Sequence, residues 1–399
     1  MKSVTGGVTA AKGFNACGVA AGIKPSKKLD LALIVTDHPA RAAGVLTTNR
    51  VKAASVLISQ ARLRRGRASA ILINSGCANC LTGDAGRQDA LRLTRAVARR
   101  LRIPENDVLV ASTGLIGKRL PVERVLRAVP SLVKHVSRAN HADAAQAILT
   151  TDLRIKEAAV ETMIGGHRCR VGGMAKGAGM IAPSMATMLC VVTTDVVIAP
   201  ALLRTLLRQA TARTFNRITV DGDMSTNDTV FALASGDAGA VIRSTGTSAR
   251  LFARTLETVM ERLATLIVQD GEGVTRTMRV HVDGARTDRD AQACARQIAN
   301  SPLVKTMLAG SDPNPGRIAA AAGASTARFD AARLEIAIGS HTIVANGMAR
   351  LNNVAMLRRL LSRPAVTVRV NLHAGRGSGW MLASDLTEDY VRINAGYAT

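Results

Sequence analysis

The sequence predicts a mixed α/β fold, because strand-like and helix-like stretches alternate along it without an internal repeat or a long linker. Its 399 residues suffice for one large domain or for two packed ones. Apolar residues make up 47 % of the chain, as in globular proteins, whereas aromatic residues make up only 2 %. We therefore expect a core built from Val, Ile, Leu, Ala and Met.

Short runs rich in β-branched residues predict the strands. In chain order these runs are 32–36, 71–74, 108–113, 189–197, 217–220, 279–282, 334–338 and 366–370. Residues 335–344 resemble a hairpin with Gly339 and Ser340 at its turn. Apolar side chains at helical spacing predict helices over 87–102, 200–213 and 254–268. Pro200 suits the first turn of the second helix, where its missing N–H has no partner to lose.

The hydropathy pattern contains neither a membrane-spanning segment nor a secretory signal. No stretch approaches the roughly 18 apolar residues that a membrane helix needs. The N-terminal residues 1–14 contain no apolar segment of the kind found in secretory signals. We expect a cytoplasmic protein with no membrane partner.

The chain is strongly basic, with 53 Lys and Arg against 29 Asp and Glu and a formal net charge of +24. Such a balance suits nucleic-acid binding. However, the charge is spread along the chain, with its densest runs at 62–67 and 97–102, and aromatic residues that could stack on bases are nearly absent. We expect a solvated, arginine-rich surface and no nucleic-acid partner.

Several site classes lack their signatures in the sequence. The six cysteines are sparse, as in a reduced cytosolic protein, and the Cys77–Cys80 CxxC has no second pair to complete a zinc site. Residues 221–232 imitate a calcium loop, but Thr226 and Ala232 stand where Gly and Glu are required. P-loop, dinucleotide-binding, HExxH and GxSxG motifs are absent. We expect no metal and no bound cofactor.

Thr187 is the best candidate nucleophile. It follows a loose stretch rich in Gly, Ala and Met, residues 174–186, and directly precedes the apolar run 188–192. If the Ala186–Thr187 peptide bond is broken, the freed α-amine lies beside Oγ1, and its usual pKa of about 7.7–8.0 suits a general base. Attack by Oγ1 on the preceding carbonyl can make that cut itself. On chemistry alone, a buried threonine at the start of a strand remains the alternative.

Six segments resemble the ornithine acetyltransferase family, the bifunctional glutamate N-acetyltransferase/amino-acid acetyltransferase of arginine biosynthesis. They are "ASTGLIG" (111–117), "AKGAGMIAPSMATML" (175–189), "TFNRITVDGDMSTNDT" (214–229), "QDGEGVTR" (269–276), "SPLVKT" (301–306) and "DLTEDYVRINAGYAT" (385–399). The opening residues 6–35 fit the family as well. The resemblance runs in order over essentially the whole chain, and its "APSMATML" core is specific.

The resemblance implies a precursor that cuts itself before Thr187. The products would be an α chain, 1–186, and a β chain, 187–399, assembled as two α and two β chains. The implied fold is a four-layer α-β-β-α sandwich of the self-cleaving aminopeptidase type, topologically distinct from N-terminal-nucleophile hydrolases.

The implied reaction moves an acetyl group from N2-acetylornithine to glutamate through an acetyl-Thr187 intermediate, in a ping-pong scheme. Acetyl-CoA is a candidate second donor, although the sequence has no separate CoA-binding motif. Neither ATP nor a metal is needed, because one amide replaces a similar amide.

The resemblance also implies roles for single residues. Thr113 and Gly114 match the family's oxyanion pair, which stabilises a tetrahedral O⁻. The matched substrate-binding residues are Thr150, Lys176, Thr187, Glu272, Asn394 and the terminal Thr399. A cation at Lys176 can hold a carboxylate, and a carboxylate at Glu272, between two glycines, can hold an ammonium group.

Some positions depart from the family's pattern. Pro315 stands where the family has Trp, Cys77 where it has Asn, and Leu153 where it has Thr, and residues 382–387 read "LASDLT". None of these positions is the nucleophile or a matched binder. Two other functions stay open from sequence: a self-processing amidohydrolase that passes the acyl group to water, and a non-catalytic basic relative that binds nucleic acid.

Overall fold

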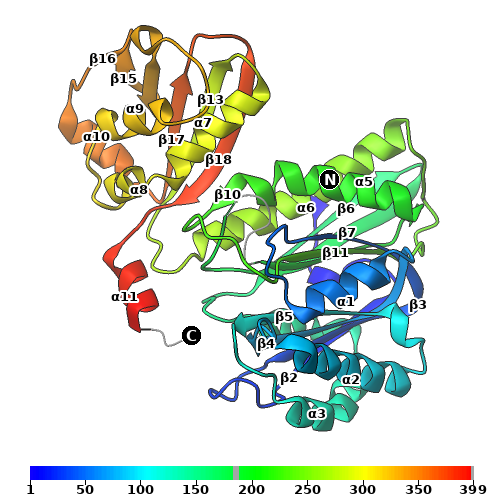
Figure 1. Cartoon of the computed structure of the whole chain (residues 1–399). Coiled ribbons are helices and arrows are strands. Elements are labelled where there is room, and N and C mark those ends of the chain that lie inside the picture. Colours follow the sequence, from blue (N-terminus) through cyan, green and yellow to red (C-terminus); the bar gives the residue numbers. More distant parts are fainter. Residues whose placement is uncertain (183–187, 397–399) are drawn as a thin grey trace.

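The computed structural model describes residues 1–182 and 188–396, and these residues form two lobes (Figure 1). Within these ranges the first lobe contains a nine-stranded sheet, called here the large sheet, and helices α1–α6. The second lobe contains a seven-stranded sheet, the small sheet, and helices α7–α10. Strands β9 and β12 form a separate pair, and α11 follows the second lobe.

The element bounds are as follows. The strands are β1 (Lys2–Ser3), β2 (Phe14–Val19), β3 (Leu31–Leu46), β4 (Arg67–Cys77), β5 (Val108–Leu115), β6 (Lys156–Ile164), β7 (His167–Lys176), β8 (Leu189–Thr194), β9 (Val197–Ile198), β10 (Ile218–Thr219), β11 (Thr229–Ala234), β12 (Val241–Ile242), β13 (Thr277–Ala285), β14 (Glu335–Ile338), β15 (His341–Ala345), β16 (Met348–Ala349), β17 (Ala365–Asn371) and β18 (Gly377–Ser384). The helices are α1 (Ala54–Leu63), α2 (Gly83–Leu101), α3 (Val122–Lys134), α4 (His141–Ala147), α5 (Pro200–Arg213), α6 (Thr247–Gln269), α7 (Asp288–Asn300), α8 (Pro302–Ala309), α9 (Pro315–Gly323), α10 (Val354–Leu361) and α11 (Glu388–Gly396).

The large sheet has the order β1-β6-β7-β8-β11-β3-β4-β5, with β2 also paired to β3. The long strand β3 joins its two halves. Its beginning pairs with β2 and β4, and its end pairs with β11. The register with β4 shifts between Val35 and Ala40, where Pro39 removes a backbone donor. The two halves of the sheet can therefore lie face to face.

Side-chain alternation along the strands builds three stacked interfaces. Between the two halves, one inner cluster combines Met174, Val191 and Phe231 with Ile34, Ile71 and Leu109. Outside one half, Val171, Cys190 and Val192 pack against α5 and α6. Outside the other half, Leu33, Leu72 and Val108 pack against α2 and α3. The first lobe is thus a four-layer α-β-β-α sandwich (Figure 1), which confirms the predicted fold class.

The second lobe stacks its helices on the small sheet, of order β10-β18-β13-β17-β14-β15-β16. Residues of α7–α10 and of the sheet share one apolar cluster. Trp380 on β18 instead packs against the core of α5 and α6. Its ring stacks on the guanidinium groups of Arg279, at 4.3 Å from the ring centroid, and of Arg217, at 5.3 Å. This stack joins the two lobes.

The predicted elements are confirmed, with one strand divided. Each predicted strand overlaps an observed one, and the hairpin turns at Gly339 and Ser340 between β14 and β15. The predicted helix 200–213 matches α5, with Pro200 in its first turn. The predicted strand 189–197 breaks into β8 and β9 at Asp195, because this buried carboxylate accepts hydrogen bonds from the backbone N–H groups of Lys12 and Arg170.

The two predicted fragments share the large sheet. Strands β8 and β11 follow residue 187, yet β8 pairs with β7 and β11 pairs with β3, both of which precede it. The predicted cleavage position therefore does not coincide with the boundary between the lobes. None of the helices in residues 1–182 and 188–396 combines the length and apolar character needed to cross a membrane.

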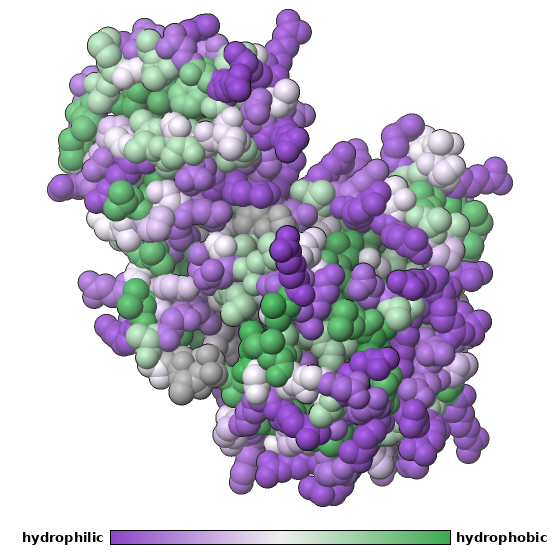
Figure 2. Space-filling model, in the orientation of Figure 1, coloured by the Kyte–Doolittle hydropathy of each residue, from purple (hydrophilic) through white to green (hydrophobic). Residues whose placement is uncertain are grey.

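Hydrophilic side chains dominate the outline of both lobes in the view of Figure 2. Several surface arginines pair with nearby carboxylates, for example Arg92 with Glu123 at 2.6 Å. Apolar side chains appear on this face in smaller patches. Exposed arginines such as Arg92 are therefore both solvated and paired.

Candidate active site

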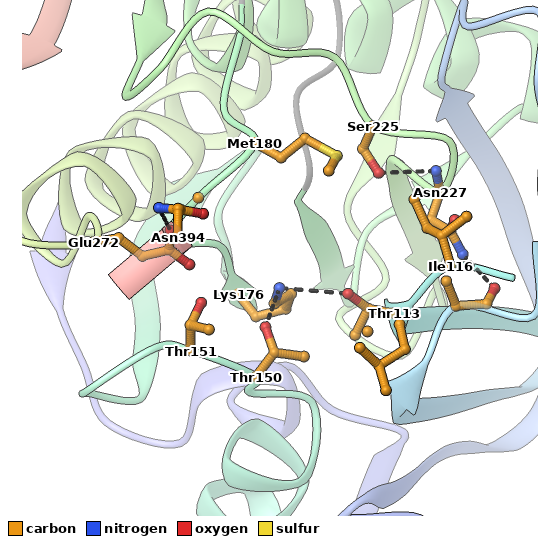
Figure 3. A pocket seen from close by; sticks show the side chains of 14 residues that line it. Thr113, Ile116, Thr150, Thr151, Lys176, Met180, Ser225, Asn227, Glu272 and Asn394 are labelled. Carbon is orange, nitrogen blue, oxygen red and sulfur yellow. Dashed lines mark hydrogen bonds between the residues drawn. The ribbon is translucent and has the colours of Figure 1, made fainter. Parts of the chain in front are cut away.

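The predicted site residues meet at one cavity of about 220 Å³. Its lining includes Thr113 and Gly114 at the end of β5, and Lys176 at the end of β7 (Figure 3). Thr150, Glu272 and Asn394 also line it. The remaining predicted residues, Ala186, Thr187 and Thr399, lie outside the described residues.

Lys176 lies at the centre of this cavity (Figure 3) and is 2 % exposed. Its Nζ donates hydrogen bonds to Thr150 Oγ1 at 2.8 Å and to Thr113 Oγ1 at 3.4 Å. Burial lowers the pKa of Lys176 below its usual range, while the nearby Asp152 carboxylate opposes that shift. When protonated, Lys176 can bind a carboxylate, and it also fixes the hydroxyls of both threonines.

Thr113 and Gly114 end β5 beside the parallel strand β4. Gly114 has φ +123°, and a Cβ atom there would lie 2.4 Å from the Gly76 carbonyl carbon. Only glycine fits this backbone position. Because Thr113 Oγ1 accepts a hydrogen bond from Lys176, its own proton is free to point elsewhere. A hydroxyl and an N–H are thus adjacent at a strand end, as an oxyanion site requires.

Glu272 supplies a negative charge to the same cavity. The loop that carries it follows α6, and the Glu272 N–H donates to Ala178 O at 2.9 Å. Its carboxylate accepts a hydrogen bond of 2.9 Å from Asn394 Nδ2 on α11. A Cβ atom at Gly179 would lie 2.4 Å from this carboxylate. One cation and one carboxylate therefore face the same space, an arrangement complementary to a zwitterionic amino acid.

Sequence reasoning missed a polar group on the opposite wall, residues 225–228. Asn227 Nδ2 donates to Ala78 O and Ser112 O, both at 2.7 Å, and so joins the ends of β4 and β5. Asp228 Oδ1 accepts a hydrogen bond of 3.0 Å from the N–H of Met188, the residue after the predicted nucleophile. Burial raises the pKa of Asp228 well above its usual range. The signal for these residues lay in the segment "STNDT", which belongs to a stretch that resembles the family but to which no site role was assigned.

The calcium-like segment has a structural contact of its own. Asp221 accepts hydrogen bonds from the N–H groups of Met180, at 2.6 Å, and Ile181, at 2.8 Å. It therefore anchors the glycine-rich stretch that leads to residue 187. Among the described residues, no group of three or more His, Cys, Asp or Glu is arranged to hold a metal ion.

Both members of the CxxC motif are buried. Cys77 Sγ donates to Lys118 O at 3.2 Å, and burial raises the pKa of its thiol. Cys80 packs with Ala53, Val56 and Ala78 in a small apolar cluster. These contacts are those of packing residues, Cys77 at the end of β4 and Cys80 in the loop that follows.

Three curated relatives match this chain over nearly their full lengths. The Arginine biosynthesis bifunctional protein ArgJ of Gloeobacter violaceus is 45 % identical over 400 residues, covering 99 % of this chain and 98 % of the relative. The ArgJ of Geobacter sulfurreducens is 46 % identical over 394 residues, covering 97 % and 99 %. The chloroplastic ArgJ of Oryza sativa subsp. indica is 44 % identical over 411 residues, covering 100 % and 88 %.

Two solved structures are also similar in sequence. The ornithine acetyltransferase of Mycobacterium tuberculosis, complexed with ornithine, is 44 % identical, with a TM-score of 0.43, and covers 46 % of this chain and 98 % of its own. The argJ protein of Bacillus halodurans is 38 % identical, with a TM-score of 0.44, and covers 47 % and 97 %. The ArgJ family itself matches residues 15–399. These matches over nearly the whole sequence show that the chain belongs to the ArgJ family of bifunctional arginine-biosynthesis enzymes.

Proposed function

We propose that this enzyme cuts itself between Ala186 and Thr187 and then transfers an acetyl group from N2-acetylornithine to glutamate. The observation that carries the proposal is the opposition of Lys176 and Glu272 across one cavity, with Thr113 and Gly114 beside them. N2-acetylornithine carries a carboxylate and an ammonium group, which suit this pair of opposite charges. The name of the M. tuberculosis relative, ornithine acetyltransferase, supports the same donor.

In the first half-reaction, the α-amine of Thr187 takes the proton of its own Oγ1, which attacks the acetyl carbonyl. The Thr113 hydroxyl and the Gly114 N–H stabilise the resulting oxyanion. The carbon–nitrogen bond then breaks, and the leaving ornithine amine takes the proton from the Thr187 ammonium. The products are free ornithine and an acetyl ester on Thr187.

In the second half-reaction, the amine of glutamate attacks that ester. The Thr187 amine accepts the proton released from the attacking nitrogen and returns it to Oγ1 as the ester bond breaks. N-acetylglutamate leaves and the nucleophile is restored. Lys176 binds the α-carboxylate in both half-reactions, Glu272 binds the ammonium of the donor, and Thr150, Asn394 and Thr399 complete the substrate contacts.

The wider proposal concerns donors and assembly. Acetyl-CoA also acetylates Thr187, which makes the enzyme bifunctional, as the names of its curated relatives state for them. It uses no metal and no bound cofactor. The working form is cytoplasmic and contains two α chains, 1–186, and two β chains, 187–399.

Intact mass and a denaturing gel of wild type and Thr187→Ala provide the first test. Wild type should yield fragments 1–186 and 187–399, whereas the variant stays whole. The cleaved protein should then make N-acetylglutamate from glutamate with either N2-acetylornithine or acetyl-CoA. Native mass spectrometry should find two copies of each fragment.

Other outcomes would overturn the proposal. Free acetate without N-acetylglutamate, in the presence of glutamate, indicates an amidohydrolase. An uncut wild-type chain that binds RNA or DNA with a steep salt dependence indicates a basic binding protein. Failure with acetyl-CoA alone removes only the second donor.

A further inference from the structure

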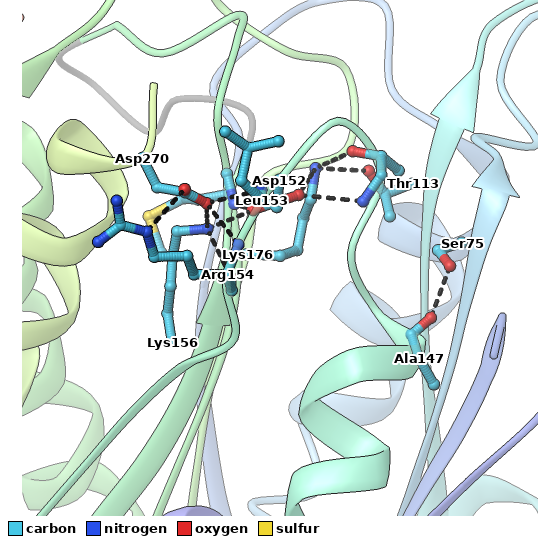
Figure 4. Close-up of polar contacts among 12 residues, drawn as sticks. Ser75, Thr113, Ala147, Asp152, Leu153, Arg154, Lys156, Lys176 and Asp270 are labelled. Atoms are coloured by element: carbon cyan, nitrogen blue, oxygen red, sulfur yellow. Dashed lines mark hydrogen bonds and ion pairs between the residues drawn. The ribbon is translucent and has the colours of Figure 1, made fainter. Parts of the chain in front are cut away.

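A buried row of charges adjoins Lys176, which lines the cavity (Figure 4). Lys156 Nζ contacts Asp152 Oδ1 at 2.7 Å and Asp270 Oδ2 at 2.6 Å. The three side chains are between 0 and 4 % exposed. Desolvation makes buried ion pairs expensive, so an apolar group of the same volume often stabilises a protein at least as well. The presence of this row therefore points to a role in the site beyond stability.

Asp152 touches two of the segments that carry substrate-binding residues. Its Oδ1 accepts a hydrogen bond of 2.7 Å from the N–H of Gly177, directly after Lys176. Its Oδ2 accepts one of 3.0 Å from the N–H of Thr150 and lies 3.8 Å from Lys176 Nζ. A single carboxylate thus fixes the backbone beside Thr150 and Lys176 and also faces the lysine charge.

Asp270 extends the same row to the segment of Glu272, two residues further along. Its Oδ2 accepts hydrogen bonds from the N–H groups of Leu153 at 3.0 Å and Arg154 at 3.2 Å. Because Lys156 bridges both carboxylates, the segments of Thr150, Lys176 and Glu272 are held to one another. Figure 4 shows the contacts that run from Asp270 through Lys156, Asp152 and Lys176 to Thr113.

The charges around Lys176 have opposing effects on its pKa. Burial lowers it most, Asp152 opposes that shift most, and the positive charge of Lys156 lowers the pKa further. The more distant carboxylates of Glu272 and Asp228 raise it. Lys24 also faces this group, and burial lowers its own pKa to about 8. Asp152 is therefore the main group that keeps Lys176 positively charged.

We propose that Asp152, locked by Lys156 and Asp270, is a positioning residue of the acetyl-transfer site: it orients the segments of Thr150 and Lys176 and holds the lysine in its charged form for the substrate carboxylate. This inference rests on the proposed function. It assigns to the row a role in substrate binding beyond the stability of the fold.

The test is the pH profile of kcat/KM for N2-acetylornithine in wild type, Asp152→Asn and Lys156→Met. Loss of the Asp152 charge should move the alkaline limb of the profile to lower pH by about one unit or more, and raise KM about tenfold. Loss of the Lys156 charge should move the same limb to higher pH. The ammonium group of the substrate titrates equally in all three enzymes and cannot produce opposite shifts.

Asp270→Asn is the matched comparison, because Asp270 contacts Lys156, whereas Asp152 also lies 3.8 Å from Lys176 Nζ. It should lower the thermal midpoint and move the alkaline limb less than Asp152→Asn does. Intact mass confirms self-cleavage for every variant. Rates are normalised to the amplitude of the acetyl-enzyme burst. If Asp152→Asn does not fold, the shift of the alkaline limb to higher pH in Lys156→Met tests the proposal by itself.

Alkaline limbs at the wild-type pH, or shifted in the same direction in both variants, would show that the row only supports the fold. That result is distinct from failure of the proposed function, in which wild type itself makes no N-acetylglutamate.

Discussion

Asn394 Nδ2 donates a hydrogen bond of 2.9 Å to the carboxylate of Glu272, from which it is separated by 122 positions in the chain. The contact brings helix α11 to the wall of the candidate cavity. The start of the helix is held as well, because Thr387 Oγ1 donates to Gly273 O at 2.7 Å. Helix α11 therefore contributes Asn394 to the lining of the candidate site.

Replacing Asn394 by Ala should raise KM for N2-acetylornithine about tenfold, because a hydrogen bond to a charged group contributes about 1.5–3 kcal/mol. The thermal midpoint should hardly change, since α11 contains no buried residue. Val391→Ala, on the same helix and 59 % exposed, is the control for general effects on α11. Equal kinetics in both variants would remove Asn394 from the substrate site.

Gly114→Ala should reduce kcat at least a hundredfold, as loss of an oxyanion donor does in other enzymes. The added methyl group collides with the Gly76 backbone and displaces the N–H. Gly117→Ala is the matched control: φ is also positive there, at +82°, but no atom lies within 4 Å of the added carbon. Comparing the steady-state rates of the two cleaved variants separates the effect of the Gly76 clash from the effect of strain at a positive φ.

Asp228 should make the free energy of unfolding fall as pH rises. Burial raises its native pKa above the unfolded value, so the native chain keeps a proton that the unfolded chain releases. Its stabilising contribution is complete below the unfolded pKa of about 3.9 and is lost towards the native pKa, by up to about 1.4 kcal/mol per pH unit.

Asp228→Asn removes this titration and can still accept the hydrogen bond from Met188. Urea unfolding between pH 4 and 8, in the uncut Thr187→Ala background, measures the effect. The Asn variant should gain stability relative to its parent as pH rises. A constant difference across the range would contradict a raised pKa.

The Trp380 stack should couple the two lobes. Arg217→Ala removes the guanidinium that the first lobe contributes, at a cost of about 0.5–2 kcal/mol. Because Trp380 is the sole tryptophan, its fluorescence reports directly on this contact. Arg213→Ala, which breaks a pair with Glu257 but no ring contact, is the control. An unchanged Trp380 emission in Arg217→Ala would rule out the coupling.

Local patterns predicted the elements whose periodicity is strong. Helix α5 matched its predicted bounds, and β4, β5 and β17 follow from runs of β-branched residues. Strands β6 and β7 were missed because charged and small residues interrupt their apolar positions. Helix α7 was missed because its buried face consists largely of Ala and Cys rather than of large apolar residues.

The site was predictable only as far as single residues resemble a family motif. Thr113, Lys176 and Glu272 were named in advance, and the structure brings them together. The link from Lys156 to Asp270 spans 114 positions and has no local signature. Pro315, which replaces a family Trp, stands in the first turn of α9, where proline is favourable.

The placement of β8 and β11 between β7 and β3 has a consequence for how such an enzyme can be made. Neither fragment holds a complete sheet: each would expose bare strand edges, which invite aggregation. Fragments 1–186 and 187–399, if made separately, would each lack strand partners that the other supplies. If the chain is cut before Thr187, as proposed, the uncut precursor brings these strands together first, and the two products then share one interleaved sheet.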